Sequence, residues 1–103
     1  YGNLYGIPVP VSIHNMDGNF NYSLDKQSVK VYLKSPGQHR IPPEDITAFV
    51  DAGQINTGIF AKKQEISSVE RELPMVVQIK GSHDGADVVS IVPEKVVLTI
   101  KRR

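Results

Sequence analysis

The chain has 103 residues, of which 40% are hydrophobic and 22% charged, with a formal net charge of +1. This length is typical of one domain. The absence of cysteine excludes disulfides and thiolate metal sites. The balanced charge argues against a domain held to nucleic acid by electrostatics alone. No stretch approaches the roughly 20 apolar residues of a membrane span. Because the chain begins with Tyr1 rather than Met, we expect a single domain, 1–103, cut from a longer multi-domain protein.

Apolar and polar residues alternate along most of the chain, which indicates strands with one buried face. This pattern predicts an all-β, mainly antiparallel fold. Pro8 and Pro10 lack a backbone donor, so the first strand should lie at an edge or carry a bulge. The strands are expected at 7–13, 20–24, 28–34, 46–50, 73–80, 88–92 and 95–101. The expected core residues are Val29, Val31, Leu33, Val77, Ile79, Val96, Leu98 and Ile100.

The segment 59–72 breaks this alternation. It is rich in helix formers, and Lys62, Ile66, Val69 and Leu73 have roughly helical spacing. Either a short helix, stopped before Pro74, or a long charged loop fits. We expect 35–45 and 59–72 to be the most mobile parts. Turn residues separate the predicted strands at Asp17-Gly18, Ser35-Pro36-Gly37, Pro42-Pro43, Asp84-Gly85 and Pro93-Glu94.

Two parts of the chain repeat each other. "YSLDKQSVKVYLK" from Tyr22 is echoed 67 residues later by "VSIVPEKVVLTIK" from Val89. Upstream, Pro8 aligns with Pro74 at an offset of 66. The repeat predicts two strand–turn–strand halves related by a pseudo-twofold axis, joined by a crossover at 35–72. Strand–turn–strand units under the same burial rules also look alike without such a relation, and that alternative stays open.

The order of these motifs resembles a known family. "IPVPVSIHN", "SVKVYLKSP", "ITAFVDAG", Gly58 and "VVSIVPEKVVLTIK" follow the pattern of YbbR domains over nearly the whole chain. The connection "SPGQHRIPPED" departs from that pattern, and 59–72 looks like an insertion.

The resemblance implies a bacterial, non-enzymatic regulatory domain without cofactors or a small-molecule substrate. YbbR domains occur in tandem on the outer face of the cell membrane, anchored by a helix that would lie outside this chain. The implied partner is a membrane-bound diadenylate cyclase, which makes cyclic di-AMP, or a sister YbbR domain. The resemblance carries over no catalytic residue. Asp51, after "AFV", is interpreted as structural, because an aspartate there can accept backbone N–H bonds in an Asx turn.

The residues themselves offer little chemistry, so we predict no catalytic, cofactor or metal site. Ser82, His83 and Asp84 are consecutive and point apart, unlike a catalytic triad. Asp84 and Asp87 supply too few ligands for calcium. No Gly-rich phosphate loop follows a strand. The histidines show no metal-ligand spacing and are interpreted as exposed loop residues: His14, His39 and His83.

Basic clusters and aromatic side chains remain. "AKK" at 61–63 and "KRR" at 101–103 are small basic clusters, and the latter is interpreted as a frayed C-terminus. Aromatic residues on the mixed strand faces either pack within the sheet or form a contact surface. These are Tyr1, Tyr5, Phe20, Tyr22 and Tyr32.

The leading hypothesis is therefore a non-catalytic interaction module. The alternative is an RNA-binding β domain, since YbbR-like sheets are similar to the β domain of a ribosomal protein, although a shared fold is weak support for a shared function.

Overall fold

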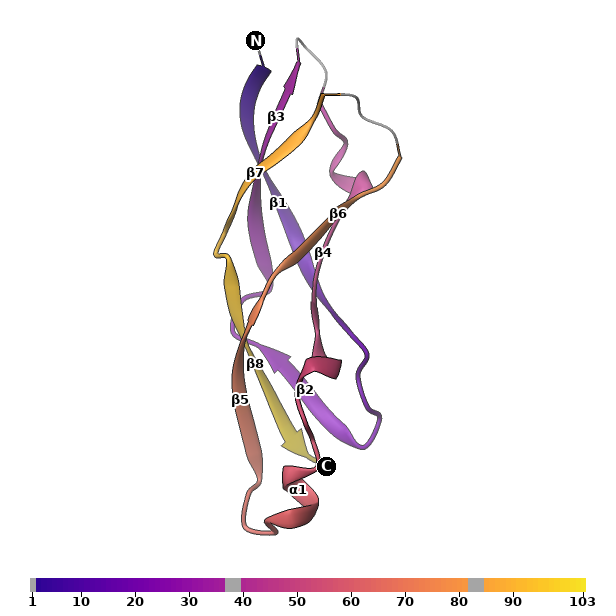
Figure 1. The fold of residues 1–103 in the computed structure, drawn as a ribbon, viewed down its shortest axis with the longest axis vertical. Helices are drawn as coiled ribbons and strands as arrows, with labels where there is room; N and C mark the ends of the chain where they lie inside the picture. Colours follow the sequence, from indigo (N-terminus) through magenta and orange to yellow (C-terminus); the bar gives the residue numbers. More distant parts are fainter. Residues whose placement is uncertain (1, 37–39, 82–84) are drawn as a thin grey trace.

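The computed structural model describes residues 2–36, 40–81 and 85–103. The molecule is elongated, 57 × 21 × 16 Å, with one sheet above the other along the long axis (Figure 1). A five-stranded sheet has the order β6-β4-β1-β3-β7, and a three-stranded sheet has the order β2-β8-β5. The elements are β1 Gly2–His14, β2 Phe20–Leu24, β3 Ser28–Pro36, η1 Pro43–Asp45, β4 Ile46–Asp51, η2 Ala52–Gln54, α1 Ile59–Lys62, β5 Ser68–Pro74, β6 Val76–Ile79, β7 Asp87–Val92 and β8 Lys95–Arg102.

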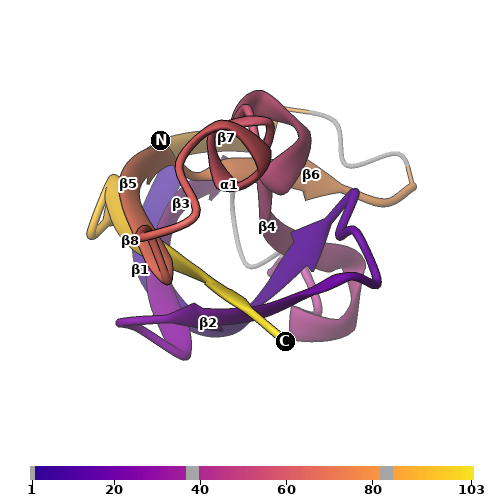
Figure 2. The ribbon, with the colours of Figure 1, turned by 90° about the horizontal axis from the view of Figure 1, so that it is seen from below.

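The all-β prediction is confirmed, and all the predicted strands are present. All pairings are antiparallel except the parallel contact of β1 with β4. Viewed along the long axis, the strands wind around one common core (Figure 2). None of the helices in the described part of the chain is long and apolar enough to cross a bilayer.

The segment 59–72 combines a helix and a strand. The predicted short helix is present at Ile59–Lys62. β5 begins at Ser68, so neither the helix nor the alternative loop continues to residue 72. Val69 and Leu73 are both buried. A spacing of four residues fits one helix face and one strand face equally well. These residues form a strand rather than a helix because β5 pairs with β8.

The predicted strand at 73–80 is divided between the two sheets. At Met75 the backbone N–H donates to the carbonyl of Glu94, 2.9 Å away, and ends the pairing with β8. Beyond it, β6 pairs with β4 in the upper sheet. The core prediction is wrong for Val77 and Ile79, which are only partly buried because β6 is an outer strand with one neighbour. The other six predicted core residues are buried.

The prolines of β1 lie where the strand is locally an edge. The N–H of Val11 donates to the carbonyl of Gln27, toward β3. Backbone groups alternate in direction along a strand, so the nitrogens of Pro8 and Pro10 face away from β3. On that side β4 pairs with β1 only from Val11 onward. The missing donors therefore cost no sheet bond, although β1 lies inside the sheet order.

The two halves of the chain exchange one strand each. β2 of the first half pairs in the lower sheet, and β7 of the second half pairs in the upper sheet. In the upper sheet, β3 lies between β1 of its own half and β7 of the other half. In the lower sheet, β8 lies between β5 of its own half and β2 of the other half. The pairs Val31–Ile91 and Leu98–Leu24 occupy equivalent positions 67 residues apart. This equivalence is what a pseudo-twofold relation requires, and it places the last strand of each half inside its sheet, with a neighbour on both sides.

The alignment of β1 with β5, the first strands of the two halves, differs from the offset predicted from sequence. Val9 pairs with Val29, and Leu73 pairs with Val96, which gives an offset of 64 rather than 66. Pro10 is therefore the counterpart of Pro74. A slip of two residues keeps each apolar side chain on the same strand face, so the sequence pattern could not distinguish the two offsets.

Truncation of a side chain at the centre of the lower sheet tests this arrangement. Leu98 is fully buried between β2 and β5. We expect Leu98→Ala to lower the free energy of unfolding by about 2–5 kcal/mol, through lost burial and the cavity left behind. Chemical denaturation measures this. Val89→Ala, at a side chain 55% exposed, is the control and should leave the midpoint nearly unchanged. Equal midpoints for the two variants would contradict the register.

Candidate interaction surface

The polar residues considered for chemistry do not converge. Ser82, His83, Asp84 and His39 lie outside the described residues. His14 is exposed at the end of β1, where its ring stacks on Phe49 at 3.8 Å between centroids. Asp87 is exposed at the start of β7. Within the ranges that the structure describes, no group of three histidine or acidic side chains could hold a metal ion.

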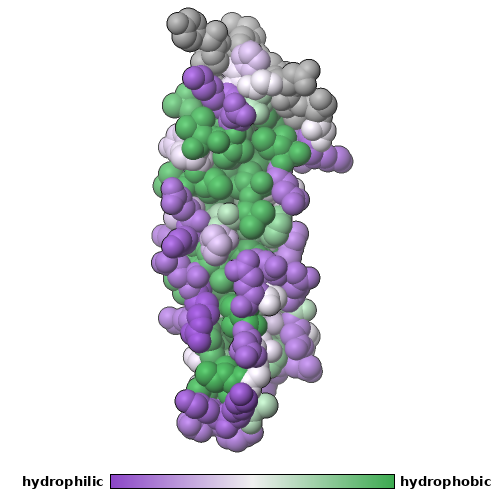
Figure 3. Space-filling view, viewed as in Figure 1, coloured by the Kyte–Doolittle hydropathy of each residue, from purple (hydrophilic) through white to green (hydrophobic). Residues whose placement is uncertain are grey.

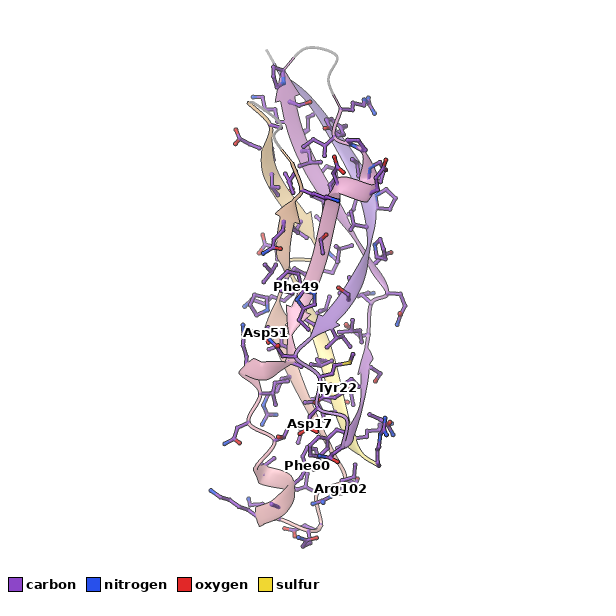
Figure 4. The ribbon with its side chains drawn as sticks, turned by 90° about the vertical axis from the view of Figure 1, so that its right-hand side faces the viewer. Asp17, Tyr22, Phe49, Asp51, Phe60 and Arg102 are labelled. Atoms are coloured by element: carbon purple, nitrogen blue, oxygen red, sulfur yellow. The ribbon has the colours of Figure 1, made fainter. Side chains whose placement is uncertain are left out.

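Asp51 has the structural role that the sequence predicted. Its Oδ1 accepts the Gly53 N–H at 2.9 Å and the Asn15 side-chain amide at 2.8 Å. Asn15 adopts a positive φ of 60°, which asparagine tolerates. The hydrogen bond from Asn15, then that from Gly53 and the nearby His14 charge, lower the pKa of Asp51 below its ordinary value of 3.8, against a smaller effect of burial. Asp51 thus joins the end of β1 to the end of β4 (Figure 4).

The aromatic side chains pack within the fold. Phe20 contacts Phe60 with centroids 4.9 Å apart, and Tyr22 accepts the Asp17 N–H at 2.9 Å. The buried Tyr5 accepts the Ile41 N–H at 2.9 Å. Tyr32 is half-buried beneath the Lys30 ammonium, 5.6 Å from its ring centroid. These four are therefore packing residues, whereas Tyr1 lies outside the described range.

Arg102 corrects the prediction of a frayed C-terminus. It belongs to β8, and its guanidinium lies over the Phe60 ring, 5.2 Å from the centroid. Its side chain donates to the carbonyls of Phe60, Ile66 and Lys63, the last two at 2.6 and 3.1 Å. Arg102 and Phe60 lie together at the lower end of the molecule (Figure 4). The last strand thus contacts α1 and the turn after it through three backbone carbonyls.

Among the strands in the described part of the chain, β7 carries the most large hydrophobic side chains that are exposed. Val88, Val89 and Val92 are 38%, 55% and 55% exposed. Val89 is an extra residue, because Tyr32 pairs with Ser90 and Leu33 pairs with Val88. A bulge of this kind twists an edge strand and discourages uncontrolled pairing with other chains.

The exposed valines continue into an open apolar face. β6 and β7 are consecutive in the chain but form opposite edges of the upper sheet. Ile91 on β7 and Val77 and Ile79 on β6 pack against the core while remaining partly exposed. Figure 3 shows hydrophobic surface over the upper half of this face. We call the residues Val77, Ile79, Val88, Val89, Ile91 and Val92 the β6–β7 face.

Acid unfolding tests the role of Asp51. Because its folded pKa lies below 3.8, the stabilisation from its charge is complete above that value and is lost as the pH falls through the folded pKa. The stability difference between the native chain and Asp51→Asn should therefore shrink as the pH falls from about 5 to about 2. Denaturation at each pH measures it. A difference independent of pH would contradict the assignment.

Removal of the Arg102 hydrogen bonds should loosen the lower end. We expect Arg102→Met, which retains an apolar stem against Phe60, to accelerate amide exchange in 59–67 and to cost about 1–3 kcal/mol. Arg103→Met at the exposed neighbouring position is the control. Unchanged exchange in 59–67 would show that α1 is held without Arg102.

Comparison with known proteins identifies the fold. No family model and no curated protein matches the sequence. A YbbR family protein from Desulfitobacterium hafniense superposes with a TM-score of 0.63 at 16% identity, covering 96% of this chain and 98% of that one. A YbbR-like domain from Listeria monocytogenes gives 0.62 at 19%, with coverages of 98% and 95%.

A YbbR-like protein from Streptococcus pneumoniae gives a TM-score of 0.63 at 14% identity. The alignment covers 97% of this chain but 48% of that one, so the chain spans about half the length of that protein. At these identities the likeness concerns the fold. The chain has the YbbR-like fold, as the order of its sequence motifs implied.

Proposed function

We propose that this chain is a non-catalytic regulatory domain of the YbbR kind, which acts by binding another protein. The fold shared with three YbbR-like structures supports this proposal. In the described part of the chain, the polar side chains of Asp51 and Tyr22 have structural roles, because each accepts a backbone N–H bond.

The observation that carries the proposal is the β6–β7 face. Aliphatic side chains on an edge strand cost free energy in water, and contiguous apolar surface often marks a protein contact. One edge of β7 is already paired with β3. The other offers backbone donors and acceptors beside Val88 and Val92, so a partner can gain both backbone hydrogen bonds and apolar burial there.

The proposed partner is a membrane-bound diadenylate cyclase, or a sister YbbR-like domain, on the outer face of a bacterial membrane. A segment outside this chain would supply the membrane anchor. An elongated domain that binds such an enzyme can regulate cyclic di-AMP synthesis by favouring one conformation or arrangement of it, without chemistry of its own.

Co-purification of the full-length parent protein with a diadenylate cyclase from the same cell tests the proposal. We expect the native pair to associate and Val89→Lys/Val92→Lys to lose most of that association, because lysine places charge on the contact and opposes edge pairing. Asn21→Lys/Ser23→Lys is the matched control, since these exposed residues lie on β2, the strand equivalent to β7 in the other half.

The outcomes separate the partner from the surface. If the native full-length protein fails to associate, the cyclase is the wrong partner. If the β7 variant associates as well as the control, the β6–β7 face is the wrong surface. The unfolding midpoints of both double variants should stay close to that of the native chain, which excludes loss of binding through misfolding.

RNA binding, the alternative from sequence, gains no support from the aromatic positions. An RNA-binding sheet stacks bases on exposed aromatic rings, whereas Tyr32 is half-buried and lies beneath Lys30. Fluorescence anisotropy with a labelled single-stranded RNA at low salt should show no saturable binding. Salt-dependent binding at micromolar protein would reverse this conclusion.

A further inference from the structure

A pocket of about 380 Å³ opens in the lower half of the molecule. Its lining residues come from β5 on one side and from the segment between η2 and α1 on the other. Its apolar lining comes from Ile55 and Ile59, which are half-buried, and Leu73, which is buried. Its size is at the lower end of the range for small-ligand sites.

Arg71 occupies an unusual position in this pocket. On β5 it shares a strand face with Val69 and Leu73, which are buried at 7% and 6% exposure, while Arg71 itself is exposed. Its cross-strand partner, Leu98, is also fully buried. An apolar residue would be expected at such a position. The arginine therefore marks the place where the cover of the lower core is interrupted by the pocket.

The guanidinium is held at the outer edge of β5. The Met75 N–H and the Ser67 carbonyl both form hydrogen bonds with β8 or its flanking residue. Backbone groups alternate in direction along a strand, so the N–H and C=O groups of the even-numbered residues between 67 and 75 face away from β8. The Glu70 carbonyl is one of these, and it accepts Nη1 of Arg71 at 2.7 Å. One of the five guanidinium donors is used in this bond, which orients the group while leaving the rest of the fork for a ligand.

The surrounding charges favour a monoanion. Arg71 has no carboxylate partner among the described residues. Glu72 also lines the pocket, and its carboxylate lies 3.9 Å from the Lys95 ammonium. Repulsion from Glu72 increases with the negative charge of a ligand, and the Lys95 ammonium offsets part of it, so a carboxylate fits better than a dianionic phosphate. The exposed amides of Gln54 and Asn56 can bond a polar group beside it.

We propose that this pocket binds a carboxylate carried on a short aliphatic group. Arg71 binds the carboxylate as a bidentate fork, and Ile55, Ile59 and Leu73 surround the aliphatic part. The carboxylate belongs either to a small free acid or to the C-terminus of a peptide. The site lies away from the β6–β7 face and does not depend on the partner proposed above.

Titrations followed by amide chemical shifts test the proposal. The probes are N-acetyl-leucine, its neutral amide N-acetyl-leucinamide, and an N-acetylated tripeptide that ends in leucine. The acid should shift the signals of Gln54, Asn56 and 71–73 saturably at millimolar concentration. It should bind about tenfold more tightly than the amide, equivalent to about 1.4 kcal/mol. Tighter binding of the tripeptide would assign the site to a peptide terminus, and equal or weaker binding to a free acid.

Variants link binding to the guanidinium. Arg71→Gln should abolish the preference for the acid over the amide, and Arg71→Lys should retain part of it, because lysine keeps the charge without the planar fork. Lys101→Gln, at an exposed cation on β8, is the matched control and should bind as the native chain does. Equal affinity for acid and amide, shifts confined to other surfaces, or unchanged binding by Arg71→Gln would each overturn the proposal.

Discussion

The exchange of β2 and β7 between the two halves of the chain is the constraint on which the rest of the structure depends. β3 and β8 each pair on one side with their own half and on the other side with the opposite half. Val31, Leu33, Leu98 and Ile100 on these strands are fully buried. Because β3 and β8 each need a neighbour from the other half, neither half can complete its sheet alone, and the core forms only when the chain has crossed between them.

This arrangement also decides which strands remain at the edges, and the chain protects these edges differently. β5 is an edge of the lower sheet, where Pro74 offers no donor and the Arg71 guanidinium covers the Glu70 carbonyl. β7 carries the bulge at Val89 and keeps its exposed valines. Hydrophobic side chains therefore stay accessible on β7, where we propose protein binding, while β5 instead presents a cation beside a pocket.

Two polar contacts hold the connections between the sheets. Asp51 bonds Asn15 and Gly53 at the junction of β1, β4 and η2. Arg102 binds carbonyls of α1 and the following turn. Together they contact the two ends of the segment 52–67, which contributes Gln54, Ile55, Asn56 and Ile59 to the pocket. The proposed ligand site therefore depends on contacts far apart in the sequence, whereas the β6–β7 face depends on the course of the upper sheet.

The sequence by itself determined the all-β class, most strand positions, the central core residues such as Leu98, and the Asx turn at Asp51, because each depends on local alternation or local turn chemistry. It also contained the 67-residue echo. The tertiary structure decided what local pattern leaves ambiguous: β5 instead of a helix at Val69 and Leu73, the offset of 64 for the first strands, and the partial exposure of Val77 and Ile79. Only the structure showed Arg71 beside a pocket and Arg102 against α1, since strand pairing places these side chains among residues distant in sequence, and no local periodicity encodes that choice of neighbours.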